Sequence, residues 1–378
     1  MSEMMIMERM TTALRVEMAY NLLEANLVKI SDFERIAVFS GRANIPLAQE
    51  VCDLLQIPLN IGIVEFSDGE FKAKLQINVR GRHVFIIQPT NPPAENWLEL
   101  YFMIDAARRA SADKITVIMP YAGFSRQERK DEPRVSISFK VMLRQIEQAG
   151  ATRIVACDLH AAASQGFVDI PFDNLFVPPF LLAPFANFFA PNTVCDTCLV
   201  TDLGYSKIAD VYADLLGCEL VLARKKRKGP DELEDRIILV GEVKKRAIFI
   251  DDIASTFGTA NRIGRAIRKA GAEYLAAVMV HPLLSENPQN PAKDVISNSK
   301  NSPFEDFVFA NTVLIDQEKI RRIEKAIFSK SPRGRIYIVS CARLLAKTIQ
   351  EIYERGSVSD IFEDNKRQLR ELKNLIVL

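Results

Sequence analysis

The chain has 378 residues, of which 48% are hydrophobic and 26% charged, the composition of a globular protein long enough for two domains. Its formal net charge of +1 gives no support for a polyanion-binding tail, so we expect no nucleic-acid partner. No apolar run approaches the length of a membrane span, and the first residues, MSEMMIMERM, lack the apolar core of a signal peptide. We therefore expect no membrane partner.

The six cysteines are scattered, and Cys195 and Cys198 form the only C-x-x-C pair. In a chain with only three histidines, this pair is weak evidence for zinc or redox chemistry. We expect reduced thiols and a cytoplasmic location.

Strand-like and helix-like segments alternate along the chain. Methionine, leucine and alanine recur at helical spacing in residues 1–33, which predicts a helical extension outside the main fold. After it, RIAVFS, HVFIIQP, KITVIMP and RIVACDLH are typical of buried strands, and NWLELYFMIDAARRAS and SISFKVMLRQIEQAG of helices. This order predicts an α/β unit with a parallel sheet.

The alternation resumes after the proline-rich stretch VPPFLLAPF. CLVTD, ELVLAR, RIILVGEV, RAIFIDD and EYLAAVMVH are expected strands, and YSKIADVYADLLG is an expected helix. The polar stretch LLSENPQNPAKDVISNSKNSPF is expected to be a loop. The sequence thus predicts a second α/β unit with a parallel sheet.

The stretch AIFIDDIASTFGTANRIGRAI carries the clearest chemical signal. A short apolar strand ends at two acids, Asp251 and Asp252, and a turn with small residues and hydroxyls leads into a helix. The N–H groups and the dipole of such a helix start attract an anion, whereas paired carboxylates suit sugar hydroxyls or a divalent cation. The stretch therefore predicts a site for a phosphorylated sugar; the alternative is an ordinary strand–turn–helix with surface acids.

Other polar clusters follow expected strands, where open α/β sheets bind ligands. MPYAGFSRQERKDEPR is rich in cations, which suits a polyphosphate or else a solvated loop. CDLHAA brings His160 beside an acid, and VTDLGYSK places Asp202 at a strand end. The five cations at 224–228 either close over a transferring phosphoryl group or form a solvated loop, and EFSDGEFK reads as a turn between two strands.

Together these clusters resemble the ribose-phosphate diphosphokinases, the enzymes that make phosphoribosyl pyrophosphate (PRPP). The motifs that carry the resemblance, in chain order, are FSDGE, NVRGRHVFIIQPT, IDAARRASADKITVIMPYAGFSRQERKD, DLHA with QGFVDIPFDNL, VGEV with IDDI, and GSVSDIF. They cover residues 34–285 and 302–362. So many motifs in the same order make the resemblance specific, although none would suffice alone.

The resemblance implies two phosphoribosyltransferase-like domains, each a mostly parallel sheet flanked by helices, with the active site between them. We expect an ATP-side domain at 34–178, a ribose 5-phosphate-side domain at 179–352, and a C-terminal segment at 353–378 whose residues 353–362 pack back on the N-terminal domain. The resemblance also implies ATP, ribose 5-phosphate and Mg²⁺ as ligands. The assembly would be dimers forming a hexamer, or a hetero-oligomer with a homologue.

The matching motifs also assign site residues. The ATP-binding residues would be Phe66, Asp68 and Glu70, contributed by a neighbouring subunit, together with Arg126, Gln127, Asp131, Arg134 and His160. Mg²⁺ or its waters would be bound by His160 and Asp202. Ribose 5-phosphate would contact Asp251 and Asp252 through its hydroxyls, and Ser255, Thr256, Gly258 and Thr259 through its phosphate. The catalytic cations would be Lys226 and Lys228, with Lys225 and Arg227 as the alternative register.

Three departures from the family pattern bear on activity. Ser255 stands where the phosphate loop usually begins with an aspartate, and Tyr205 stands where a second glycine usually follows Asp202, bringing bulk where a backbone could approach a ligand. Ser285-Glu286 replaces a Ser-Gly pair and precedes an insertion, which puts allosteric regulation in doubt. We expect an active diphosphokinase; the alternatives are a catalytically weak or silent regulatory subunit and, more distantly, a phosphoribosyltransferase that uses PRPP.

Overall fold

The N-terminal half of the chain is built on a fully parallel six-stranded sheet. The computed structural model describes residues 33–226, 236–329 and 334–374, so the helix expected at 1–33 lies outside the described residues apart from Phe33. The strands of this sheet, in spatial order, are β2 (Leu59–Ile61), β1 (Ile36–Ser40), β5 (His83–Ile87), β6 (Lys114–Met119), β7 (Arg153–Cys157) and β8 (Phe172–Leu175).

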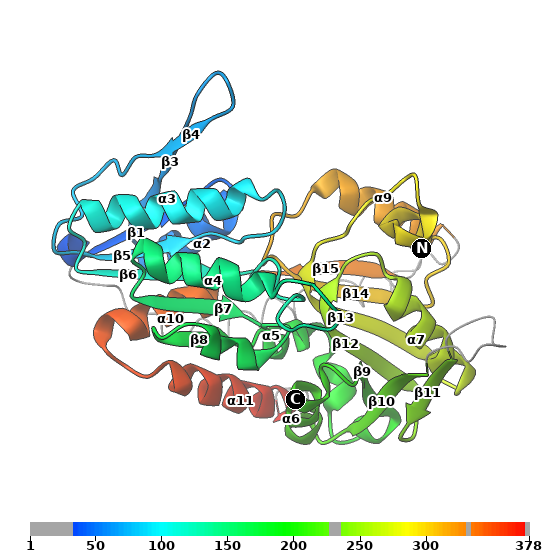
Figure 1. Cartoon of the computed structure of the whole chain (residues 1–378). Coiled ribbons are helices and arrows are strands. Elements are labelled where there is room, and N and C mark those ends of the chain that lie inside the picture. The colour runs from blue at the N-terminus through cyan, green and yellow to red at the C-terminus, as the bar shows by residue number, and fades with distance from the viewer. Residues whose placement is uncertain (1–32, 227–235, 330–333, 375–378) are drawn as a thin grey trace.

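Helices cover both faces of this sheet, which explains why its strands are apolar throughout. In β1, Val38 packs into one hydrophobic cluster, whereas Ala37 and Phe39 pack into another on the opposite face. Figure 1 shows α3 (Glu95–Arg109) and α4 (Ser138–Ala149) side by side on one face, where they contact each other.

A two-stranded antiparallel hairpin projects from the N-terminal half. It consists of β3 (Ile63–Glu65) and β4 (Phe71–Ala73), and it extends away from the rest of the molecule (Figure 1). The segment between the two strands contains the FSDGE motif.

The C-terminal half is built on a seven-stranded sheet that is parallel except for one edge strand. Its strands, in spatial order, are β11 (Arg236–Val240), β10 (Glu219–Lys226), β9 (Thr197–Asp202), β12 (Arg246–Ala254), β13 (Tyr274–Pro282), β14 (Asp306–Ala310) and β15 (Arg335–Val339). Only β11 runs antiparallel to its neighbour among the described strands of this sheet. One face is covered by α7 (Gly258–Lys269) and α9 (Gln317–Phe328).

The remaining described helical elements include four helices of more than ten residues, and the others are short. The full set is α2 (Ile45–Leu55), α5 (Pro178–Leu181), α6 (Ser206–Leu216), α8 (Val295–Ser299), α10 (Ala342–Glu354), α11 (Val358–Asn374) and the 3₁₀ turns Phe33–Arg35, Ala162–Phe167, Ala183–Phe189, Val194–Asp196 and Pro291–Lys293.

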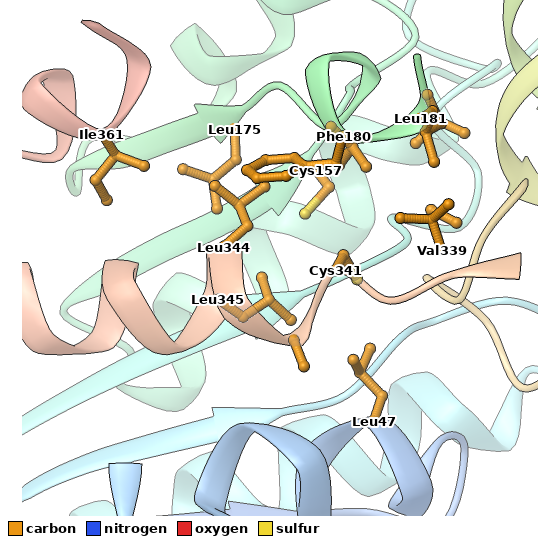
Figure 2. Close-up of a cluster of buried hydrophobic side chains, with 14 of the residues drawn as sticks. Leu47, Cys157, Leu175, Phe180, Leu181, Val339, Cys341, Leu344, Leu345 and Ile361 are labelled. Carbon is orange, nitrogen blue, oxygen red and sulfur yellow. The ribbon is translucent and has the colours of Figure 1, made fainter. Parts of the chain in front are cut away.

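One hydrophobic cluster joins the two halves. After β15 the chain returns to the N-terminal sheet, where α10 packs against α2, and α11 contacts both α10 and α6. Figure 2 shows Leu47 of α2 and Leu345 of α10 in the same cluster as Leu175 of β8. The Phe362 ring lies 5.3 Å from the Phe176 ring, so α11 also contacts the segment after β8.

The predicted α/β architecture with two mostly parallel sheets is confirmed. The loop expected for LLSENPQNPAKDVISNSKNSPF is wrong in part, because this segment contains α8. The side chain of Asp294 accepts a hydrogen bond from the N–H of Ser297 and caps α8, a helix of five residues that is too short to give a periodic signal. None of the described helices is long and apolar enough to cross a membrane.

Candidate active site

A pocket of about 440 Å³ lies where strands of the C-terminal sheet end, facing residues of the N-terminal half. β9 ends at Asp202, and β12 carries the acid pair near its own carboxyl end, which is the edge where parallel sheets bind ligands. The lining residues are Arg126, His160, Asp202, Gly204, Tyr205, Lys225, Met279 and the whole stretch 251–260.

His160 and Asp252 meet across the two halves. Nδ1 of His160 lies 2.6 Å from Oδ2 of Asp252, and this hydrogen bond raises the pKa of His160. Burial by itself would raise the pKa of Asp252, but the hydrogen bond and charge of His160 outweigh burial and lower it. The contact engages Nδ1 of His160 and so leaves Nε2 as the ring nitrogen available to a ligand.

Asp251 lies close to two other acidic side chains of the pocket. Burial, together with the nearby carboxylates of Asp252 and Asp202, raises the pKa of Asp251 well above its usual value. Asp202 also orders its own turn, because its Oδ1 accepts hydrogen bonds from the N–H of Gly204 at 2.8 Å and of Tyr205 at 3.3 Å. Three carboxyl groups thus lie close enough to affect one another's charge.

Residues 255–259, called the phosphate loop below, form a turn that leads into α7, as the sequence predicts. No side chain caps this end of the helix, so its first N–H groups remain oriented for an anion. Phe257 adopts the left-handed conformation, with φ of 61°, and its buried ring stacks on Phe307 at 5.1 Å. An exposed Phe at positive φ would be unfavourable, but here ring burial stabilises the turn that exposes the N–H groups.

Tyr205 does not project freely into solvent. Its side chain is buried, and its hydroxyl donates a hydrogen bond of 2.9 Å to Oδ1 of Asp158, the second residue before His160. Asp158 also accepts from the N–H of Val177 at 2.7 Å. Burial raises the pKa of Asp158 to about 7, although both hydrogen bonds lower it. Tyr205 therefore ties the Asp202 turn to the strand end that carries His160.

The predicted ATP-binding residues are only partly gathered at the pocket. Arg126 and His160 line it, whereas Gln127, Asp131 and Arg134 are exposed on the segment between β6 and α4. The hairpin residues Phe66, Asp68 and Glu70 are exposed and do not line the described pocket of their own chain. Their roles stay predictions.

The catalytic cations also stay predictions. Lys226 is the last residue of β10, and Lys228 lies outside the described residues. Lys225 does reach the pocket, where its Nζ donates to Oγ1 of Thr259 at 3.3 Å. The family resemblance gives Lys225 and Arg227 as the alternative catalytic cations, and the contact of Lys225 with the phosphate loop is consistent with that alternative.

The sequence does not predict three features of this pocket. They are the burial of the Phe257 ring, the hydrogen bond of the Tyr205 hydroxyl, and the role of Asp158 as its acceptor. A large apolar residue between Thr256 and Gly258 is a usable signal, because such a side chain must be buried somewhere. The bond between Tyr205 and Asp158 has no local signal, since the two residues are 47 positions apart.

The carboxylate cluster fits a hard divalent cation. Among the described residues, no group of three or more histidine, cysteine, aspartate or glutamate side chains forms a preformed metal centre. Mg²⁺ characteristically uses one or two carboxylates and completes its shell with water and substrate phosphates. The carboxyl groups of Asp202, Asp251 and Asp252 lie close enough to raise the pKa of Asp251, so a bound cation would relieve their mutual repulsion and find oxygen ligands there.

Comparisons with known proteins identify the family of the chain. A family model described as the N-terminal domain of ribose phosphate pyrophosphokinase matches residues 36–150. A ribose-phosphate pyrophosphokinase of Chlorobaculum tepidum is 37% identical over 342 residues, covering 90% of this chain and 98% of that protein. Ribose-phosphate pyrophosphokinase 1 of Spinacia oleracea is 37% identical over 87% of this chain and 93% of its own length.

The fold agrees as well. The crystal structure of phosphoribosylpyrophosphate synthetase from Mycobacterium smegmatis superposes with a TM-score of 0.72 at 29% identity, covering 85% of this chain and 100% of that chain. The similarity therefore extends over most of the chain. On this evidence the chain belongs to the ribose-phosphate pyrophosphokinase family.

Proposed function

We propose that the protein transfers the β,γ-diphosphoryl group of ATP to the anomeric hydroxyl of ribose 5-phosphate, giving PRPP and AMP. The observation that carries this proposal is the joint presence, in one pocket, of an anion-binding helix start and two adjacent carboxylates. An anion site and hydroxyl acceptors side by side match the two ends of a sugar phosphate.

The residues on the ribose side have distinct tasks. The N–H groups at the start of α7 and the hydroxyls of Thr256 and Thr259 would bind the 5-phosphate. Asp251 and Asp252 would accept hydrogen bonds from the ribose hydroxyls and so orient the anomeric oxygen. The pair between His160 and Asp252 would fix the carboxylate that performs this task.

The nucleotide side must stabilise a transition state with negative charge on the phosphoryl oxygens. Arg126 lines the pocket, and Gln127, Asp131 and Arg134 would complete the ATP site when their segment closes on the nucleotide. Nε2 of His160 and the carboxylate of Asp202 would hold Mg²⁺ or its waters. When bound, Mg²⁺ supplies charge neutralisation and orientation of the transferring group.

We also propose that the active unit is an oligomer. The hairpin residues Phe66, Asp68 and Glu70 are exposed and lie away from the pocket of their own chain, as expected if they contact the adenine bound to a neighbouring subunit. All six cysteines are among the described residues and none is joined in a disulfide, which supports the proposed cytoplasmic location.

The proposal is tested by measuring AMP release from ATP, Mg²⁺ and ribose 5-phosphate by the purified protein. AMP should form only when all three are present, with PRPP in equal amount. Free ribose in place of ribose 5-phosphate is the matched control and should give little product. Absence of AMP release under all conditions would reject the proposal, and activation of a second, active homologue by the inactive protein would favour the regulatory alternative.

A further inference from the structure

The segment after β13, which contains the insertion, is hydrogen-bonded to the backbone before the phosphate loop. The N–H of Leu284 donates to the carbonyl of Ala254 at 2.9 Å, and the N–H of Ser285 donates to the carbonyl of Ser255 at 3.0 Å. The hydroxyls of Ser255 and Ser285 lie 3.1 Å apart. This segment therefore follows the backbone that leads into the phosphate loop.

Asn298 of α8 completes this attachment. Its Nδ2 donates to the carbonyl oxygen of Thr256 at 2.8 Å, and to that of Ala292 at 3.2 Å. Its own carbonyl accepts a hydrogen bond of 2.9 Å from Nδ2 of Asn261, a buried residue in α7. Asn298 thus contacts the chain on both sides of residues 257–259, whose N–H groups are the ones proposed to bind phosphate.

The contact with Thr256 fixes the orientation of one peptide group. In a trans peptide the N–H of the next residue points opposite to the carbonyl. Because the carbonyl of Thr256 is directed to Asn298, the N–H of Phe257 is directed to the other side of the loop. Thr256, Phe257 and Gly258 line the pocket, whereas none of the described residues of α8 does.

The anchorage of α8 is itself built from charged contacts. Asp294 caps α8 and accepts a hydrogen bond of 2.9 Å from the N–H of Asn287. Glu286 forms ion pairs with Lys319 and Arg322 of α9, at 3.8 Å and 2.9 Å. The amide of Asn298 is therefore presented from a held element rather than from a freely moving loop tip.

From these contacts we infer that Asn298 is a positioning residue for the sugar-phosphate end of the substrate. It holds the Thr256–Phe257 peptide so that its N–H faces the phosphate and its carbonyl faces away. If this peptide turned over, a carbonyl oxygen would face the phosphate dianion in place of a donor. The inference rests on the proposed function, because it concerns the same phosphate loop.

The test compares three variants with the wild-type protein. Asn298→Asp is nearly isosteric, but its carboxylate cannot donate to Thr256 and repels the carbonyl oxygen. Asn298→Ala removes the donor without adding charge. Asn290→Asp is the matched control, because Asn290 is exposed in the same segment and its backbone N–H, not its side chain, makes the bond to Asn287.

Isothermal titration should show ribose 5-phosphate binding weakened on the order of tenfold in Asn298→Asp and several-fold in Asn298→Ala. ATP binding and kcat at saturating ribose 5-phosphate should stay at the wild-type values, so that the loss appears in KM for ribose 5-phosphate alone. Asn290→Asp should match the wild type. Circular dichroism identifies folded variants, and Asn298→Ala serves if Asn298→Asp does not fold.

Two results would overturn the inference. One is unchanged ribose 5-phosphate affinity in a folded Asn298 variant, and the other is an equal loss of ATP and ribose 5-phosphate affinity. Either result leaves the proposed function standing if the wild type binds ribose 5-phosphate. If the wild type itself does not bind ribose 5-phosphate, the proposed function fails, and the inference fails with it.

Discussion

Asp252, in the C-terminal half, pairs through its carboxylate with His160 in the N-terminal half. Replacing Asp252 with asparagine removes the carboxylate, so the pKa of His160 should fall, since Asp252 is what raises it. Histidine ring resonances followed by NMR over a pH titration measure this change, and the chain has only three histidines to assign.

Asp251→Asn is the control, because it keeps the Asp252–His160 pair. His83 is an internal reference, since burial lowers its pKa to about 4 and it lies outside the pocket. A raised His160 pKa means that the pair stabilises the fold fully below the unfolded value of about 6.5, and that this stability is lost as pH rises through the folded value. An unchanged His160 midpoint in Asp252→Asn would contradict the assignment.

Tyr205 should matter for stability through its hydroxyl. Tyr205→Phe leaves Oδ1 of the buried Asp158 without this donor, which should lower the free energy of unfolding by about 1–3 kcal/mol. Tyr212→Phe is the matched control, because the Tyr212 hydroxyl is buried and has no hydrogen-bond partner among the described residues. Urea unfolding of both variants decides: equal stabilities would mean that the Asp158 bond contributes nothing.

At the scale of the element, the end of β10 places Lys225 at the pocket. If Lys226 and Lys228 stabilise the transition state, alanine at either position should lower kcat about a hundredfold with little loss of ATP affinity. Lys225→Ala should instead raise KM for ribose 5-phosphate, because Lys225 contacts Thr259 of the phosphate loop.

Steady-state kinetics with each substrate varied separately distinguish these outcomes. A large kcat loss in Lys225→Ala, with none in Lys226→Ala, would show that the register of the catalytic cations differs by one. Loss of affinity and rate in equal proportion at all three positions would mean that the cations contribute only to binding.

The elements themselves were largely predictable, because both faces of each sheet are covered and the strands are therefore apolar throughout. The start of α7 was predictable for a different reason. Small residues and hydroxyls stand between an acid pair and an amphipathic helix. α8 was not, since its five residues, VISNS, are too few to show a periodicity and the cap from Asp294 looks like ordinary loop chemistry. The contact of Asn298 with Thr256 spans 42 positions and leaves no trace in either local sequence.

At the scale of the whole molecule, the shared hydrophobic cluster predicts that both halves unfold together. Trp97, the only tryptophan and a buried residue of the N-terminal half, reports one half by fluorescence, whereas far-ultraviolet circular dichroism reports both. The two transitions should coincide. Leu345→Ala, in the cluster between the halves, should lower the free energy of unfolding measured by each signal by about 2–5 kcal/mol.

Leu314→Ala is the control for this change, because Leu314 is 55% exposed and its truncation opens no buried cavity. A fluorescence transition separated from the circular dichroism transition would show that the two halves unfold independently. If Leu345→Ala changed only the fluorescence transition or only the circular dichroism transition, the cluster would stabilise one half alone.

Because α10 packs on α2, the apolar surface of α2 stays uncovered during part of protein synthesis. The ribosome makes α2 long before α10, so the apolar surface that Leu345 covers next to α2 stays exposed until α10 emerges. We therefore expect a chaperone to bind this surface on the nascent chain during that interval. Ribosome-bound chains stalled before α10 should retain a hydrophobic-binding chaperone, whereas chains released after α11 should shed it.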